Sequence, residues 1–145
     1  MKIRKATKKD IRKIAKVWIQ EYSKKPYYEK WSLQSSQKRV KDYFDKKYII
    51  YVAAIEKEII GFIIFEICPF YNGSQTYIAD IAVLSNNQGN GVGKSLMKKA
   101  ESESRKRGAK KISLRTSKKS RAFGFYKKLN YNEEKDFVNL DKKLR

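Results

Sequence analysis

The feature that most constrains this fold is a strand that enters a helix through a glycine-rich turn, over residues 77–100. Tyr77–Val83 is apolar and rich in β-favouring residues, which predicts a strand. Ser85–Gly89 is polar and predicts a turn, and the apolar residues after Gly91 recur at helical spacing, which predicts a helix. Three of the seven glycines fall within residues 89–93, so the backbone there is expected to have a special task.

A junction of this kind makes an anion site from the backbone alone. The first N–H groups of a helix lack partners within the helix, and the helix dipole adds partial positive charge at the same end. Glycines leave room for a ligand to approach and permit a positive φ angle. The pattern therefore predicts a phosphate-binding turn, and a glycine-rich helix start without a ligand is the alternative.

Two phosphate-binding motifs compete for this turn. The P-loop motif ends as Gly93-Lys94-Ser95 does, but it begins with a glycine where this sequence has Gln88. P-loop proteins also need a parallel sheet and an acidic magnesium ligand on a second strand. Residues 88–93 instead read Gln-x-x-Gly-x-Gly directly after the strand. This segment resembles the acetyl-CoA motif of the GCN5-related N-acetyltransferase (GNAT) superfamily, Gln/Arg-x-x-Gly-x-Gly/Ala.

Composition narrows the remaining chemistry. The single cysteine, Cys68, leaves no internal disulfide and no cysteine metal cluster, and no metal is expected. The lack of histidine excludes Ser-His and Cys-His catalysis and histidine-ligated zinc. No apolar run is long enough to span a membrane, and the N-terminus lacks the apolar core of a signal peptide. We therefore expect a single domain over residues 1–145, in the cytoplasm and without a membrane partner.

The net charge of +20 suggests either an anionic partner or a bias in composition. A surface this basic attracts nucleotides, CoA, RNA and acidic proteins. Lysine is spread along the whole chain, however, which favours genome bias or a hot habitat over a dedicated nucleic-acid role. The sequence also lacks a helix-turn-helix, zinc-knuckle, RNP or GXXG motif. A specific nucleic-acid partner is not favoured, and a basic nucleic-acid-binding module stays the alternative function.

The first part of the chain predicts a strand followed by two helices. Residues 1–6 alternate apolar and basic side chains, as an edge strand does. Residues 8–22 predict an amphipathic helix that begins at a capping box, Thr-x-x-Asp, over residues 7–10. Ser35 or Ser36 is expected to cap the second helix.

The later elements are strands over residues 48–55, 59–67 and 111–115, a short helix over 121–129, and a final hairpin from Tyr131 with Val138 and Leu140 pointing inward. Cys68-Pro69 is expected to end the second of these strands, before a loop over residues 70–74. The resulting order, β-α-α-β-β-β-α-β-α-β-β, resembles the GNAT fold over essentially the whole chain. It implies an α/β (α+β) class: a mixed central sheet with an antiparallel first half, parallel strands splayed apart at the acetyl-CoA site, and helices on both faces.

A second segment resembles the family pattern Asn-x-x-Ala-x-x-Phe/Leu-Tyr-x-Lys-x-Gly-Phe. Its matches are Ala122, Phe125, Tyr126 and Lys128, and its departures are Lys119, Asn130 and Tyr131. Asparagine tolerates the left-handed conformation that glycine would supply, so the turn is expected to survive. The resemblance implies that Tyr126 is the general acid that protonates the departing CoA thiolate. The alternative is a core aromatic on an amphipathic helix.

The resemblance also implies how acetyl-CoA, the cosubstrate, is bound. Backbone N–H groups of the turn would hold the pyrophosphate, and the exposed edge of the central strand would pair with the pantetheine arm as a neighbouring strand does. The implied residues are Ile81, Ala82, Val83, Gln88, Gly89, Asn90, Gly91, Val92, Gly93, Lys94 and Ser95. For Lys94, an ordinary solvated lysine is the equal alternative.

An amine acceptor must lose a proton before or during its attack on the thioester, so a base is needed. Polyamine-acetylating members place a Glu before an Asp on the central strand. Here Ala79 and Asp80 stand at these positions, which leaves Asp80 as the candidate base. The alternatives are that Asp80 is only a structural carboxylate, that Glu66 or Glu29 is the base, or that the proton leaves through water.

The acceptor pocket is expected between the aromatic loop, the start of the second helix and the loop Pro69–Ser74. Tyr27, Tyr28 and Trp31, clustered around Glu29, are suited to enclose a cationic amine, and packing over the core is the alternative. We therefore predict an acetyl-CoA-dependent N-acetyltransferase that acts by direct transfer, in a ternary complex, on a primary amine of a small molecule or protein. An inactive CoA-binding protein of this fold is a third reading. The assembly state is open, with a homodimer among the options.

Overall fold

The computed structural model describes residues 1–144, which fall into two compact units divided after Arg115. The larger unit consists of a sheet and the helices that cover it. The smaller unit consists of a short helix and an extended tail. The expectation that residues 1–145 form a single domain stays a prediction.

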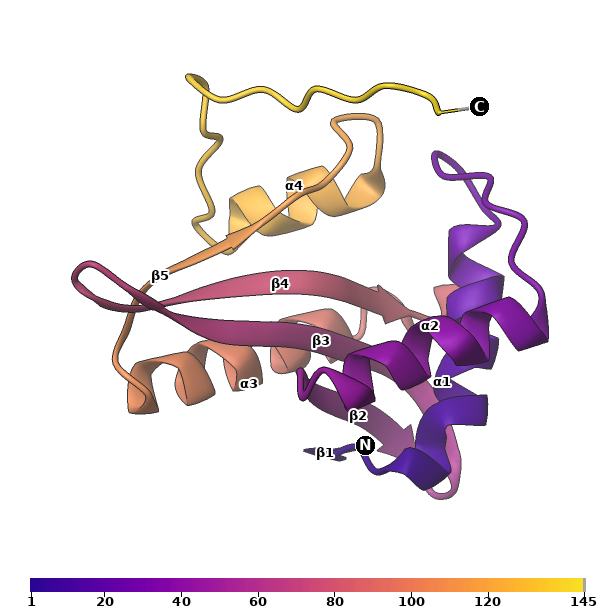
Figure 1. Cartoon of the computed structure of the whole chain (residues 1–145). Coiled ribbons are helices and arrows are strands. Elements are labelled where there is room, and N and C mark those ends of the chain that lie inside the picture. The colour runs from indigo at the N-terminus through magenta and orange to yellow at the C-terminus, as the bar shows by residue number, and fades with distance from the viewer. Residues whose placement is uncertain (145) are drawn as a thin grey trace. The chain divides into compact units, whose positions relative to one another are not determined.

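The larger unit is built on a five-stranded sheet with the order β1-β2-β3-β4-β5 (Figure 1). The strands are β1 (Lys2–Lys5), β2 (Ile49–Ile55), β3 (Glu58–Phe70), β4 (Gly73–Val83) and β5 (Ala109–Leu114). Neighbours from β1 to β4 pair antiparallel, whereas β4 and β5 pair parallel. This confirms the predicted mixed sheet with an antiparallel first half, and β1 is the predicted edge strand.

Helices cover both faces of this sheet, as predicted. They are α1 (Ile11–Tyr22), α2 (Leu33–Asp45) and α3 (Val92–Lys106). Val52, Phe62 and Ile64 of the sheet share one buried cluster with residues of α1 and α2. On the other face Gly61 lies beside α3, where an added Cβ would stand 3.4 Å from Leu96. Among residues 1–144, no helix is both long and apolar enough to cross a membrane.

The starts of the first two helices follow from local hydrogen bonds. The Thr7 N–H donates to the Asp10 carboxylate at 2.8 Å, as the predicted capping box requires. The cap predicted for α2 is wrong: Ser32, rather than Ser35 or Ser36, is the N-cap. Ser35 is its reciprocal partner, because each of the two backbone N–H groups donates to the other serine's hydroxyl at 2.9 Å.

The hairpin between β3 and β4 is longer than predicted. β3 does not end at Cys68-Pro69 but continues to Phe70, and the expected loop over 70–74 is reduced to a turn at Tyr71-Asn72. The pairing of β2 with β3 stops at Phe65, so at Pro69 the strand β3 is paired with β4 alone. A proline is tolerated there because no second ladder needs its missing N–H group.

The smaller unit contains α4 (Arg121–Lys128), which confirms the predicted short helix. The final hairpin predicted from Tyr131 is wrong, because residues 131–144 form no strand. Val138 and Leu140, which were expected to point inward, are 79% and 91% exposed. Charged side chains flank them on both sides, so a strand pair here would bury too little apolar surface to offset its ordering entropy.

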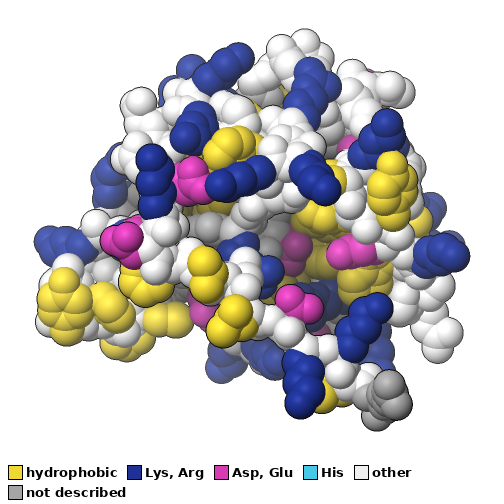
Figure 2. Space-filling view, turned by 90° about the horizontal axis from the view of Figure 1, so that it is seen from above, with side chains coloured by type: hydrophobic (Ala, Val, Ile, Leu, Met, Phe, Trp, Pro, Cys, Tyr) yellow, Lys and Arg dark blue, Asp and Glu magenta, His cyan; other side chains and the backbone are white. Residues whose placement is uncertain are grey.

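On the face shown in Figure 2, charge is distributed rather than gathered in one patch. Figure 2 shows Lys and Arg side chains across the whole face in view, with Asp and Glu side chains among them. This agrees with the even spread of lysine along the sequence. On this face, the charge does not form the continuous basic stripe that follows a nucleic-acid backbone.

Candidate active site

The glycine-rich turn forms the predicted strand-to-helix junction. β4 ends at Val83, a 3-10 turn spans Ser85–Asn87, and α3 begins at Val92. Gly89 and Gly91 both have a φ angle of +81°, which L side chains rarely adopt. Apart from chain neighbours, no heavy atom of residues 1–144 lies within 4 Å of where a Cβ would stand on either glycine. Both glycines therefore border open space that a ligand can enter.

The start of α3 presents to this space backbone donors that have no partner within the helix. Gly91 is the N-cap, and the first bond within the helix runs from the Ser95 N–H to the Gly91 carbonyl at 3.0 Å. The N–H groups of Val92, Gly93 and Lys94 precede that bond and are directed outward at the helix end. With the positive end of the helix dipole, this donor set suits a phosphate group.

The parallel ladder between β4 and β5 covers only the first part of β4, and the predicted splaying of the two strands stays a prediction. Their parallel ladder runs from the pair Ser74 and Ala109 to the pair Ile78 and Leu114 and stops there. Beyond it, residues 80–83 of β4 pair with β3 on their other side. Among residues 1–144 this segment has no strand partner on the β5 side. Its edge can therefore pair with an extended ligand that carries amide groups.

A carboxylate of α1 fixes the polar turn that precedes the glycines. Glu21 accepts hydrogen bonds from the Ser85 N–H at 3.1 Å, the Ser85 hydroxyl at 3.0 Å and the Gln88 amide at 3.3 Å. Lys24 forms an ion pair with Glu21 at 3.1 Å and donates to the Ser85 hydroxyl at 2.6 Å. Gln88 also donates to the Val83 carbonyl at 2.8 Å. No pattern in the sequence indicated a role for Glu21 or Lys24.

Asp80 lies at the centre of a side-chain network. The Tyr22 hydroxyl donates to one carboxylate oxygen at 2.9 Å, and the Tyr43 hydroxyl donates to the other at 2.8 Å. The Arg39 guanidinium donates to the Tyr43 hydroxyl at 3.1 Å and lies over the Tyr43 ring, 5.0 Å from its centroid. These four residues come from α1, α2 and β4, and the sequence indicated only Asp80 among them as a site residue.

The surroundings of Asp80 shift its acidity. Burial raises the pKa of Asp80 above its ordinary value, because desolvation disfavours the carboxylate. Hydrogen bonds from Tyr43 and Tyr22 and the charge of Arg39 oppose this rise in pKa, whereas the charge of Glu29 adds to it. Burial and the Asp80 charge also raise the pKa of Tyr43, so this phenol stays protonated. A carboxylate with a raised pKa is suited to accept a proton near neutral pH.

The other carboxylates considered as bases lie in different surroundings. Glu29 is exposed and accepts a hydrogen bond from the Trp31 indole N–H at 2.8 Å. Glu66 pairs in register with Tyr77, at a point where β5 still runs beside β4. Among the described residues, no group of three or more His, Cys, Asp and Glu side chains could hold a metal ion.

The aromatic loop between α1 and α2 combines packing and exposure. Trp31 packs edge-on against the buried Trp18 with ring centroids 5.5 Å apart, and Tyr27 packs against Tyr22 at 5.4 Å. Tyr28 is 62% exposed. Trp31 and Tyr27 therefore contribute to packing, the alternative given above, while Tyr28 presents its ring to solvent.

The loop Pro69–Ser74 is not close to the rest of the expected acceptor pocket. It forms the tip of the β3-β4 hairpin, whereas the α1-α2 loop lies toward the opposite end of β4 (Figure 1). Asp80 lies roughly 23 Å along the strand from Gly73, at about 3.3 Å per residue. The inclusion of this loop in the acceptor pocket was therefore wrong.

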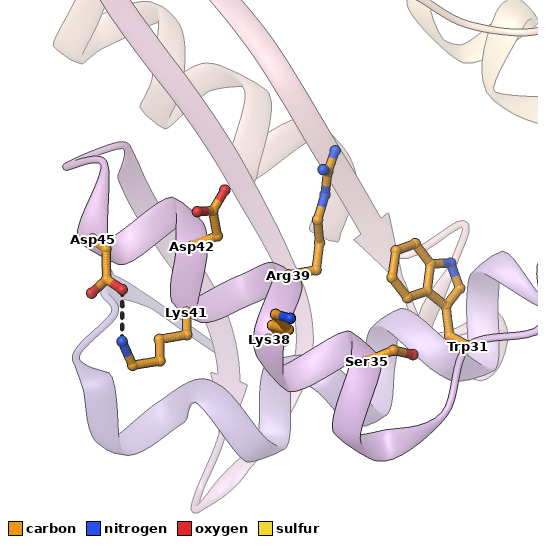
Figure 3. Close-up of a pocket in the computed structure, with 7 residues that line it drawn as sticks. All are labelled: Trp31, Ser35, Lys38, Arg39, Lys41, Asp42 and Asp45. Atoms are coloured by element: carbon orange, nitrogen blue, oxygen red, sulfur yellow. Dashed lines mark hydrogen bonds and ion pairs between the residues drawn. The ribbon is translucent and has the colours of Figure 1, made fainter. Parts of the chain in front are cut away.

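A groove of about 520 Å³ runs along the outer side of α2 (Figure 3). It is lined by Trp31, Ser35, Lys38, Arg39, Lys41, Asp42 and Asp45. Trp31 and the start of the helix were expected to contribute to an acceptor pocket, and Arg39 connects this groove to Asp80 through Tyr43. The charged side chains of α2 gave no signal in the sequence, because exposed lysines and acids are common on helices.

Tyr126 lies on α4, in the smaller unit. Its ring is buried and contacts Phe125 and Tyr131, with centroids 5.2 and 6.0 Å apart. Asn130 has a φ angle of +68°, which confirms the left-handed conformation expected where the motif has glycine. The role of Tyr126 as an acid stays a prediction.

The family of the chain follows from a comparison with family models. A model described as the acetyltransferase (GNAT) family matches residues 14–131. The chain therefore belongs to the GNAT family of acetyltransferases, as both sequence motifs indicated. Members of this family use acetyl-CoA as cosubstrate. A search of curated proteins found no match.

Solved structures of the same fold are similar at low sequence identity. A possible acetyltransferase from Clostridium difficile 630 is 19% identical with a TM-score of 0.82, covering 99% of this chain and 97% of that one. A transcriptional regulator from Bacillus halodurans C-125 is 22% identical with a TM-score of 0.81, covering 97% and 99%. An aminoglycoside acetyltransferase from an uncultured soil metagenomic sample, in complex with sisomicin, is 20% identical with a TM-score of 0.80, covering 99% and 96%. These likenesses show the fold and do not select an acceptor.

Proposed function

We propose that this chain is an acetyl-CoA-dependent N-acetyltransferase that acetylates a primary amine of a small molecule or protein within a ternary complex. The observation that carries this proposal is the open edge of β4 at residues 80–83, which leads directly into the glycine-rich turn. A strand edge followed by an anion site suits acetyl-CoA, whose amide-bearing arm leads to a pyrophosphate. The cytoplasmic location expected from the sequence belongs to the same proposal.

In this proposal the backbone binds the donor. The edge of Ile81–Val83 pairs with the pantetheine arm, and backbone N–H groups of the turn and of the start of α3, chiefly those of Val92, Gly93 and Lys94, bind the pyrophosphate. The side chain of Gln88 is engaged by the Val83 carbonyl and Glu21, so it shapes the turn and leaves ligand contacts to the backbone. Lys94 is exposed in the first turn of α3, where its charge favours phosphate.

Acetyl-CoA supplies an acetyl thioester that a neutral amine can attack. Asp80 accepts the amine proton, directly or through a water molecule, because its carboxylate has lone pairs beyond the two that the tyrosines occupy. A backbone N–H near Ile81 stabilises the oxyanion as the new C–N bond forms. Tyr126 gives its proton to the sulfur as the C–S bond breaks, so that CoA leaves as a thiol. Cys68 is exposed on β3, outside both motifs, and has no part in this reaction.

Titration of the purified protein with acetyl-CoA and with ATP-Mg, each at two salt concentrations, tests donor binding. We expect binding of acetyl-CoA that survives moderate salt, with little binding of ATP-Mg, because a shaped site discriminates and net charge alone does not. Equally salt-sensitive binding of both ligands would favour the basic nucleic-acid-binding module instead.

Substitution of Tyr126 by Phe separates an enzyme from an inactive CoA-binding protein of the same fold. General acid catalysis contributes about 10²- to 10⁴-fold, so Tyr126→Phe is expected to lower turnover by this order while acetyl-CoA still binds. Equal turnover by the variant would remove the acid role. No turnover by the unsubstituted protein with any amine would support the inactive reading.

A further inference from the structure

Charges of both signs lie on the acceptor side of the site. Asp80 and Glu29 form its acidic side, and Glu29 lies close enough to Asp80 to affect its ionisation. Arg39 and Lys38 are consecutive on α2 and line the adjoining groove, so they form its basic side. Arg39 is linked to Asp80 through Tyr43, so a molecule that extends from the groove toward Asp80 meets positive charge first and negative charge beyond it.

Arg39 is held by its neighbours in an orientation that suits a ligand. Its bond to the Tyr43 hydroxyl at 3.1 Å and its position over the Tyr43 ring fix the guanidinium plane. This bond uses one of the five N–H donors of a guanidinium group, whose fork geometry matches a carboxylate. Tyr43 in turn donates to Asp80 at 2.8 Å, so Arg39 and Asp80 are two hydrogen bonds apart.

The acids of the groove are already balanced by lysines of α2 and of its C-cap. Asp45 accepts from Lys41 at 2.6 Å, and Asp42 pairs with Lys46 at 3.1 Å. Figure 3 shows Arg39 extending away from α2, apart from the Lys41–Asp45 pair. The groove therefore has a surplus of positive charge from Arg39 and Lys38, and the indole of Trp31 supplies an apolar wall.

We propose that the acetyl acceptor is an amine that also carries a carboxylate, an α-amino acid with an apolar side chain. Its amine lies toward Asp80 and Glu29, its carboxylate binds Arg39 with Lys38 beside it, and its side chain contacts Trp31. This inference names the acceptor class for the proposed acetyltransferase and rests on that function. A polycationic amine would instead meet Arg39, Lys38 and a net charge of +20.

Matched pairs of amines test this proposal, each pair differing in the carboxylate alone. Phenylalanine is compared with phenethylamine and leucine with isoamylamine, at saturating acetyl-CoA. We expect kcat/KM to be roughly 10- to 100-fold higher for the amino acid of each pair, because its carboxylate forms a charge-assisted bond to Arg39. Equal or faster acetylation of the simple amines would overturn the carboxylate proposal and leave the acetyltransferase function standing. Acetylation of neither series, with acetyl-CoA bound, would overturn the amino-acid proposal alone, because the proposed acetyltransferase function also covers other small-molecule amines and protein amines.

The variant Arg39→Gln tests whether Arg39 is the residue that binds the carboxylate of the acceptor. We expect this variant to lower kcat/KM for the amino acids by about 10- to 100-fold and to change the simple amines little. Arg12→Gln, which removes the same charge from an exposed position of α1, is the matched control and should leave both series unchanged. Acetyl-CoA titration reports whether each variant is folded. An equal loss in both series would mean that Arg39 acts through Tyr43 on Asp80, which would overturn its role in binding a carboxylate.

Discussion

The donor side and the acceptor side of the candidate site are built from different groups. The donor side is backbone: the open edge of β4 and the turn at residues 88–95 lie in one continuous stretch. The acceptor side is made of side chains from α1, α2 and β4 that meet around Asp80. Every residue carries the same backbone groups, so the donor side depends on conformation, whereas the acceptor side depends on residue identity. Substitutions on the two sides should therefore have different effects.

The largest effect is expected for Asp80→Asn. Asparagine keeps the shape of the side chain but cannot accept a proton from the amine, so kcat should fall by about 10²- to 10⁴-fold. Acetyl-CoA affinity should stay unchanged, because the backbone of the donor side is intact. Steady-state kinetics and titration with acetyl-CoA check the two halves of this expectation. Retained turnover would show that water or another group removes the proton.

The pH dependence of kcat/KM sharpens the assignment of Asp80. A base must be unprotonated, and the pKa of Asp80 is raised, so activity should fall with decreasing pH at a higher pH than for an ordinary aspartate. The hydrogen bond from Tyr22 lowers the pKa of Asp80, and Tyr22→Phe should therefore move this acidic limb to still higher pH. Tyr48→Phe, beside Glu66, is the control. A loss of activity that is equal at all pH values would mean that Tyr22 is merely structural.

The donor side is tested by two glycines of similar conformation at opposite ends of α3. Gly91 and Gly108 have φ angles of +81° and +75°, and a Cβ on either would stand in open space. Gly91→Ala and Gly108→Ala should each cost about 1–2 kcal/mol of unfolding free energy through the left-handed conformation. Only Gly91→Ala should also weaken acetyl-CoA binding, by roughly 10- to 100-fold, because it shifts and covers the pyrophosphate donors. Equal affinities in the two variants would show that the turn does not bind the donor.

This contrast also explains which part of the site could be predicted from the sequence. The donor side is local, so a strand, three glycines and a helical period already indicate its shape. Asp80 was found from its position on the central strand. Its partners Tyr22 and Tyr43 are 58 and 37 residues away in the sequence, and a local pattern contains no record of such contacts. Arg39 was missed because its link to the site runs through Tyr43, whose contact with Asp80 is distant in the sequence.

The fold shows the same division between local and distant information. Helices and strands with clear periodicity were predicted correctly, whereas details that depend on neighbours were not. Ser32 lies three residues before another serine, and either has the chemistry of a cap. The strand continues past Pro69 because β2 has already ended beside it, which depends on strand pairing. Val138 and Leu140 have a strand-like pattern, but a pattern cannot show whether a surface is available to bury them.

The smallest expected effect comes from Glu21, where a side chain holds the backbone of the donor side. Its carboxylate accepts three hydrogen bonds from the turn that precedes the glycines, from Ser85 and Gln88. Glu21→Gln removes a negative charge near the proposed pyrophosphate site, and this loss by itself favours binding of acetyl-CoA. The single amide oxygen of glutamine, however, is a poor replacement for the two carboxylate oxygens that accept these hydrogen bonds. Half-buried hydrogen bonds outweigh a screened charge, so we expect acetyl-CoA to bind about 3- to 10-fold more weakly.

Glu103→Gln is the matched control for this change. Glu103 pairs with Lys99 and Lys106 on α3, so its substitution removes the same charge without loosening the turn. Titration of both variants with acetyl-CoA separates the effect of where the carboxylate lies from the effect of losing its negative charge. Weaker binding in Glu21→Gln alone would mean that the donor side, although made of backbone, depends on one side chain of α1 for its conformation. Tighter binding in both variants would mean that charge dominates and that the turn keeps its conformation without Glu21.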